Sequence, residues 1–218
     1  MKVSTLIGFV ALAQAASAHY IFTTLIAGST TSEAAVREPV NNSPITSATD
    51  PNLVCNIHTA ATSTVSVPAG STIGFKLDNT LYHLGPAAIY LGQVPSGETA
   101  ATWDGTGAHW FKIAEWGATY SQSFSFSDYN LSQLTTTIPS DVPPGDYLVH
   151  VEQIALHVVD APQWYVSCAQ ITITGGGSAN PSKVSIPGAY SANDPGLTVD
   201  IYTNPTSYTV PGPAPFTG

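Results

Sequence analysis

Charged residues are scarce in this sequence, and basic ones most of all. Of the 218 residues only 9% are charged, with 5 lysines and arginines against 14 aspartates and glutamates. The formal net charge of −9 argues against nucleic acid or an anionic membrane as a partner. A neutral partner, or a small diffusible one, is favoured instead.

Long apolar runs are missing after the N-terminus, so no later stretch predicts a membrane span. Residues 1–18 read MKVSTLIGFVALAQAASA, in which Lys2 precedes the apolar stretch 6–13 and the segment ends in the small residues 16–18. This order predicts a secretory signal peptide cleaved after Ala18. Its apolar run is too short to cross a bilayer core of about 30 Å. We therefore expect a secreted, extracellular chain that begins at His19.

Cysteine is almost absent, with Cys55 and Cys168 as the only two. In a secreted chain an even pair usually forms a disulfide, here closing a loop of roughly 110 residues and contributing about 4–5 kcal/mol in the chain-entropy model. A redox pair or a pair of metal ligands are the alternatives. Cysteines in redox pairs and metal sites usually have a close CxxC spacing, which Cys55 and Cys168 lack. A structural bridge is therefore favoured.

A sustained helical stripe is also lacking, whereas short β-rich runs recur between Gly and Pro turns. This pattern predicts an all-β sandwich, and about 200 mature residues fit one domain. Residues 19–218 should therefore form a single domain, with no second domain appended. Residues 26–52 are expected to be a long loop, and residues 175–196 are also turn-rich. The expected strands lie within the runs VSVPAGSTIGFKLDN, AAIYLGQV, HWFKIAEWG, PPGDYLVHVEQIALH and WYVSCAQITITGGG, with LTVDIY (197–202) as the last.

The motifs of common hydrolases are missing. There is no GxSxG elbow, no HExxH motif and no evident pair of flanking carboxylates of the kind that glycoside hydrolysis requires. Hydrolysis is therefore disfavoured.

A histidine at the expected mature N-terminus is an unusual metal-binding feature. His19 would carry two nitrogen donors close together, its α-amine and its imidazole Nδ1, and the amine loses its proton readily near neutral pH. One further imidazole would complete a nitrogen-rich set that suits Cu(II). The alternative is that cleavage leaves a histidine there by chance. Of the five other histidines, His83 precedes a Gly-Pro turn and His157 ends a β-rich run; the remainder are expected in ordinary surface or strand positions, namely His58, His109 and His150.

Several motifs occur in one order along the mature chain. They are HYIF, NNSPIT followed by Cys55-Asn56, YHLGP, WFKIAEWG, PPGDYLVHVEQIALH, QWYVSCAQITITGG, IPGAY and PGPAP. In this order they resemble the fungal lytic polysaccharide monooxygenases of auxiliary activity family nine, formerly glycoside hydrolase family sixty-one. The resemblance implies an immunoglobulin-like or fibronectin-III-like antiparallel β-sandwich whose long loops form a flat substrate face.

The resemblance also implies a site for one copper ion per chain. His19 would supply its amine and Nδ1, His83 its Nε2, and Tyr165 the axial phenol oxygen. His157 and Gln163 would form the outer sphere that orients what the metal binds. Taken alone, Tyr165 would be read as a core aromatic beside the disulfide, and Gln163 as a solvated strand residue.

Several aromatic residues could either contact substrate or pack in the core. Tyr202 matches a surface tyrosine that the family uses for substrate, although it could equally be a core residue of a last strand. Tyr20 and Phe22 are expected to pack inward, and Tyr190 is expected to be structural.

The implied reaction is oxidative cleavage of cellulose or a related β-glucan by hydrogen abstraction at the anomeric or fourth carbon. It uses hydrogen peroxide or dioxygen and an external electron donor, which in the family is a small reductant or cellobiose dehydrogenase. A monomer is expected. A non-catalytic carbohydrate-binding sandwich, or a copper-binding relative that does not oxidise polysaccharide, are the alternatives.

The chain departs from the family pattern in places that bear on substrate range. The stretch from His157 to Gln163 is short, no second disulfide is present, and His150-Val151-Glu152 stands where many relatives have Arg-His-Glu. Two glycosylation sequons occur, at Asn41 and Asn130, and the proline at position 44 counts against use of the first.

Overall fold

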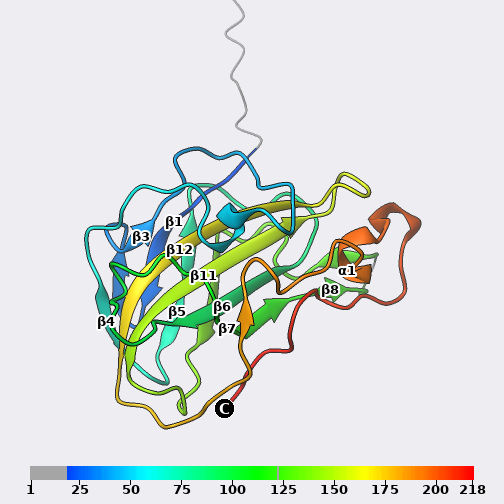
Figure 1. Cartoon of the computed structure of the whole chain (residues 1–218). Coiled ribbons are helices and arrows are strands. Elements are labelled where there is room, and N and C mark those ends of the chain that lie inside the picture. The colour runs from blue at the N-terminus through cyan, green and yellow to red at the C-terminus, as the bar shows by residue number, and fades with distance from the viewer. Residues whose placement is uncertain (1–18, 122) are drawn as a thin grey trace, which may run out of the picture.

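The computed structural model describes residues 19–121 and 123–218, and strands make up most of its regular structure (Figure 1). The expected signal peptide, residues 1–18, lies outside the described residues. The elements in chain order are β1 (Phe22–Ala27), β2 (Thr30–Ser32), β3 (Val36–Arg37), η1 (Pro51–Val54), β4 (Val65–Pro68), β5 (Thr72–Leu77), β6 (Ala87–Gln93), β7 (Ala108–Trp116), β8 (Ala118–Thr119), β9 (Ser125–Phe126), β10 (Gln133–Thr137), β11 (Gly145–Ala155), β12 (Gln163–Thr174), β13 (Val184–Ser185), α1 (Pro195–Thr198) and η2 (Ile201–Thr203).

Two packed sheets form the body of the molecule. The smaller has the order β10-β5-β1-β2, and the larger has the order β13-β7-β6-β11-β12-β3 with β4 also paired to β12. All these pairs are antiparallel except β4 with β12, which is parallel. Figure 1 shows β11 and β12, the longest strands, running side by side across the larger sheet. The predicted all-β sandwich is confirmed.

Both faces of the larger sheet are buried. Between the sheets, Phe75 and Leu25 of the smaller sheet pack with Val149, Val151 and Ile171 of the larger one. A second core lies on the outer face of the larger sheet; it includes Leu53, Tyr90, Trp103, Trp110, Leu148, Trp164 and Leu197. Burial on two faces explains why every residue of β11 from Tyr147 to Ala155 is buried, rather than every second one.

The five long β-rich runs all form strands in the structure, as β4 with β5, β6, β7, β11 and β12. In β12 the side chains of Ile171 and Ile173 are buried while Thr174 is exposed, as the alternation predicts. Tyr20 and Phe22 pack inward, also as predicted, each with 1% of its surface exposed.

Two expectations about local structure are wrong. Residues 26–52 are not one loop, because they contain the end of β1, all of β2 and β3 and the start of η1. Strands of two or three residues are too short to produce a recognisable alternation. Residues 197–202 do not form a last strand either, because Asp194 and Asp200 accept hydrogen bonds from Gly196 N and Tyr202 N and cap α1 and η2.

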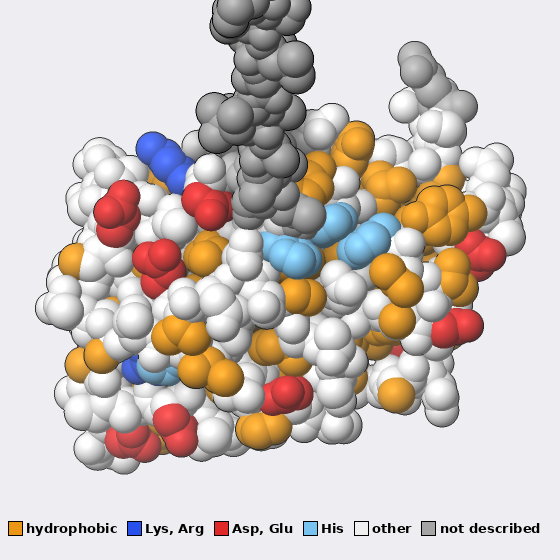
Figure 2. Space-filling model, turned by 90° about the horizontal axis from the view of Figure 1, so that it is seen from above, with side chains coloured by type: hydrophobic (Ala, Val, Ile, Leu, Met, Phe, Trp, Pro, Cys, Tyr) orange, Lys and Arg blue, Asp and Glu red, His pale blue; other side chains and the backbone are white. Residues whose placement is uncertain are grey.

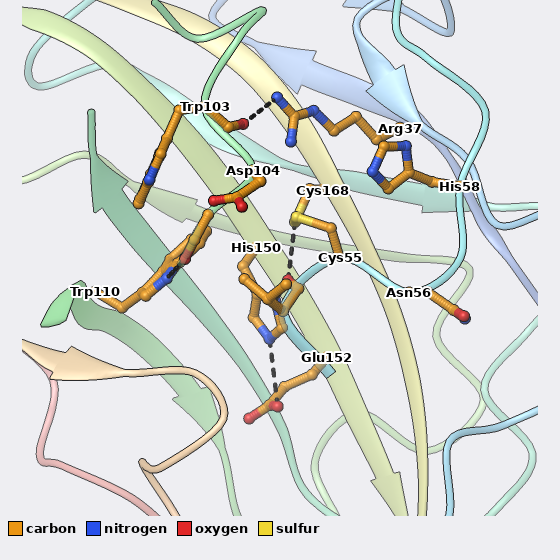
Figure 3. The surroundings of a disulfide bond; sticks show 12 residues. Arg37, Cys55, Asn56, His58, Trp103, Asp104, Trp110, His150, Glu152 and Cys168 are labelled. Carbon is orange, nitrogen blue, oxygen red and sulfur yellow. Dashed lines mark hydrogen bonds and ion pairs between the residues drawn. A yellow bond between two sulfur atoms is a disulfide. The ribbon is translucent and has the colours of Figure 1, made fainter. Parts of the chain in front are cut away.

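A disulfide joins Cys168 of β12 to Cys55, the residue after η1, as predicted. Figure 3 shows the side chain of His150 beside it, pointing toward Glu152. His150 lies on a strand, as expected, and is fully buried, with Nδ1 2.7 Å from the carbonyl of Val54 and Nε2 3.3 Å from Glu152 Oε2. Tyr190 is structural as predicted, since its hydroxyl donates to Glu152 Oε1. Among the described residues, no helix has the length and apolar character needed to cross a membrane.

Candidate metal centre

Three aromatic side chains from distant parts of the sequence meet at one end of the sandwich. His19 precedes β1, His83 lies in the loop between β5 and β6, and Tyr165 lies on β12. The ring centroids of His19 and His83 are 6.2 Å apart, and each lies 5.8 Å from that of Tyr165. Tyr165 is buried, with 3% of its surface exposed, whereas both histidines are half-buried.

The YHLGP loop that carries His83 is held against the end of β11. Ile154 N donates to Pro86 O at 2.8 Å, and Leu156 N donates to Leu84 O at the same distance. Gly85 permits this approach, because a Cβ at this position would lie 1.8 Å from the carbonyl oxygen of Ile154. Glycine is therefore required for the loop to hold His83 at the end of the sheet.

His157 and Gln163 flank these rings from the hairpin between β11 and β12. The imidazoles of His83 and His157 are stacked, with centroids 4.0 Å apart and planes inclined by 9°. Gln163 Oε1 accepts a hydrogen bond of 3.3 Å from the hydroxyl of Tyr165. Within the described part of the chain, the buried Nδ1 of His157 has no hydrogen-bond partner.

Burial sets the protonation of this cluster. It lowers the pKa of His157, with a further contribution from His19, and so favours the neutral imidazole. Burial also raises the pKa of Tyr165 well above its usual range, so the phenol keeps its proton and can donate to Gln163.

Tyr202 lies on the surface beside the cluster, not in the core. Its ring is 65% exposed, and its hydroxyl donates to the backbone carbonyl of His157 at 2.9 Å. The neighbouring Val158 and Val159 are 43% and 41% exposed. Figure 2 shows histidine side chains gathered on this face with hydrophobic side chains near them, at the surface and not at the bottom of a cleft.

The cluster fits a copper ion held mainly by nitrogen. With metal–nitrogen bonds of about 2 Å, two imidazoles on opposite sides of one ion place their ring centres about 6 Å apart, close to the separation of His19 and His83. No group of three His, Cys, Asp or Glu side chains able to hold a metal occurs among residues 19–121 and 123–218. In a chain released at His19, the α-amine would offer a third nitrogen donor beside the two imidazoles.

Comparison with known proteins identifies the family. Residues 19–209 match Auxiliary Activity family 9 (formerly GH61). The chain belongs to this family. It is 49% identical to AA9 family lytic polysaccharide monooxygenase H of Malbranchea cinnamomea over 97% of each chain. It is 42% identical to the A enzyme of Thermothielavioides terrestris over 99% of each chain.

Solved structures of AA9 enzymes share the fold. The crystal structure of HiLPMO9B superimposes with a TM-score of 0.80 at 31% identity, covering 92% of this chain and 100% of that one. A cellulose-active polysaccharide monooxygenase from M. thermophila gives a TM-score of 0.80 at 30% identity with the same coverage.

The AA9 assignment establishes the class of reaction. This protein is a lytic polysaccharide monooxygenase, a copper oxidoreductase that cleaves polysaccharide oxidatively. AA9 enzymes are copper-dependent and act with a reductant and an oxygen co-substrate, and they are in general secreted by fungi. The non-catalytic alternative is not favoured.

The remaining candidate residues lie apart from this cluster. His58 is exposed and His109 is half-buried against Trp103, with ring centroids 5.4 Å apart. Asn41 and Asn130 are both exposed, and Asn130 has a positive φ of 66°.

Sequence reasoning missed Gln153, which contacts two of the segments that form the site. A signal for it exists. On the inward face of β11, where Val149 and Val151 belong to the core, Gln153 is the one polar residue.

Proposed function

We propose that the chain released at His19 holds one copper ion through the amine and imidazole of His19 and the imidazole of His83. The phenol oxygen of Tyr165 would be a further ligand to this ion. The observation that supports this most directly is the meeting of these three rings within 5.8–6.2 Å. The family match also begins at residue 19, in accord with cleavage after Ala18 and secretion.

When bound, copper would supply one-electron redox chemistry toward hydrogen peroxide or dioxygen, with the electron coming from an external donor. The chain's own residues organise the surroundings. Tyr165 keeps its proton and is fixed by Gln163, so its oxygen has a defined direction. His157, neutral and stacked on His83, offers a ring nitrogen to a small oxygen co-substrate as a hydrogen-bond partner.

The substrate we propose is a β-1,4-linked glucan, cellulose or a related polymer, with hydrogen abstraction at the anomeric or fourth carbon. A chain laid on this face would meet the exposed ring of Tyr202 and the apolar side chains of Val158 and Val159. The histidine side chains visible in Figure 2 lie at the surface, which suits contact with a polymer surface. A cellulose-active relative shares the fold.

Residues 19–218 act as a single catalytic domain and as a monomer. The electron donor is a small reductant or a partner such as cellobiose dehydrogenase.

The decisive experiment compares the chain beginning at His19 with the same chain carrying one extra alanine ahead of it. The first should bind one copper per chain and release oxidised oligosaccharides from cellulose, detected by mass analysis, only with reductant and without chelator. The extended chain should bind copper far more weakly. Equal binding and equal product from both chains would refute the role of the His19 amine.

A further inference from the structure

Gln153 is a polar side chain in an otherwise apolar position. On β11 it shares the inward face with Tyr147, Val149, Val151 and Ala155, all of which belong to the core between the sheets. Its exposed surface is 0%. An amide in such a place costs a few kcal/mol unless its polar atoms are hydrogen-bonded, so the partners it holds identify its role.

Both ends of the amide contact segments that carry proposed copper ligands. Gln153 Oε1 accepts a hydrogen bond of 2.5 Å from the hydroxyl of Tyr20, the residue after His19. Gln153 Nε2 donates at 3.2 Å to the backbone carbonyl of His83. In the β11–β12 register, Gln153 also stands opposite Tyr165.

We infer that Gln153 is a positioning residue for the copper site, a conclusion that rests on the proposed function. Its amide links the His19-Tyr20 segment to the His83 loop and so sets the separation of the two imidazoles. The first residue of β1 that pairs in the sheet is Phe22. The side chain of Tyr20 therefore anchors the chain at a point closer to His19 than the strand pairing does.

Tyr20 transmits the effect of the amide to the site. Its ring is 1% exposed and lies 4.5 Å from the ring of Tyr165 and 5.8 Å from that of His83. When Gln153 is replaced by an apolar residue, the buried hydroxyl of Tyr20 loses its acceptor and the carbonyl of His83 loses its donor. Both segments then shift to find other partners, and the two imidazoles lose their set distance.

The test measures Cu(II) binding to the metal-free chain that begins at His19. Gln153→Leu should weaken Cu(II) affinity about 10-fold in a fluorescence or calorimetric titration, the effect typical of a lost outer-shell partner. It should also change the Cu(II) EPR parameters. The matched control is Gln170→Leu on β12, a glutamine with 2% exposure whose Oε1 accepts from the hydroxyl of Thr64 at 3.5 Å. This variant should bind copper as the wild type does.

A second variant separates positioning from folding. Removing both partners, in Tyr20→Phe with Gln153→Leu, leaves no unpaired hydroxyl and should recover most of the thermal stability lost in Gln153→Leu. Its Cu(II) affinity should stay lowered and its EPR spectrum shifted, because the link is still missing. In Gln153→Glu the acceptor for Tyr20 remains, and this variant should recover part of the affinity.

Two outcomes would overturn the inference, and they are distinguishable. If Gln153→Leu and the double variant keep wild-type affinity and EPR parameters, Gln153 serves stability only and the copper site itself stands. If the wild-type chain beginning at His19 fails to bind one copper, the proposed function fails and the inference falls with it.

Discussion

The hydroxyl of Tyr202 donates a hydrogen bond to the carbonyl of His157 at 2.9 Å, across 45 residues of sequence. This bond ties the short helix η2 to the hairpin between β11 and β12. It holds an exposed ring beside the histidine that stacks on His83. This hydrogen bond therefore connects the surface proposed for substrate to the hairpin beside the proposed copper site.

Changing Tyr202 should separate the two contributions of its side chain. Tyr202→Ala removes the ring and should weaken binding to cellulose about 5- to 10-fold, the equivalent of roughly 1 kcal/mol of aromatic contact. Tyr202→Phe keeps the ring and should retain most of the binding. Pull-down of each variant with cellulose measures this, and equal binding by wild type and Tyr202→Ala would contradict the placement of substrate on this ring.

Changing His157 should impair turnover much more than copper binding. His157→Gln is expected to lower the rate of oxidised product release about 10- to 100-fold while Cu(II) affinity stays within a few-fold, because in the proposed site this side chain lies beside the copper ligands and is not one of them. Product is measured by mass analysis and affinity by titration. His109→Gln, on β7 against Trp103, serves as the control and should change neither quantity.

Asp128 should make the stability of the protein fall as pH rises. Its side chain is 1% exposed, and neither carboxyl oxygen has a hydrogen-bond partner in the described part of the chain. Burial raises the pKa of Asp128 to about 8. The native state therefore holds a proton that the unfolded chain releases near pH 4. The stability it contributes is complete below about pH 4 and is lost as pH rises to about 8, with a slope of up to about 1.4 kcal/mol per pH unit.

Asp128→Asn removes this titration. The variant should show a flatter dependence of unfolding free energy on pH, and at pH 8 it should exceed the wild type in stability by on the order of 2 kcal/mol. Urea unfolding at pH 5 and pH 8 measures both effects. The exposed Asp141→Asn is the control. Identical slopes for the wild type and Asp128→Asn would show that the buried carboxyl does not titrate in this range.

Removing the disulfide should destabilise the domain. Replacing both Cys55 and Cys168 by alanine opens a loop that spans 113 residues and should lower the free energy of unfolding by about 2–5 kcal/mol. Both cysteines are buried, with 1% and 0% exposed, so reductant should act on the wild type only once denaturant is present. Unfolding curves with and without reductant test this, and an unchanged midpoint in the alanine variant would refute it.

Local sequence patterns predicted the long strands well but failed where the structure depends on a few residues. Runs such as β6, β7 and β11 are long enough for apolar content and β-branched residues to show their nature. The strands β2 and β3 are too short for that, and they exist because the adjacent strands β1 and β12 offer partners. Residues 197–202 contain β-formers, yet the capping aspartates at 194 and 200 direct the chain into helical turns.

By itself the sequence determined the fold class, the disulfide and the family, because repeated strand patterns, a lone cysteine pair and ordered motifs are all written along the chain. Only the tertiary structure decided which side chains meet. His19, His83 and Tyr165 come from three separate segments, and no local pattern encodes their distances. The role of Gln153 was hidden for the same reason: a hydrogen bond between distant segments depends on how the strands pack, and periodicity along one strand cannot report it.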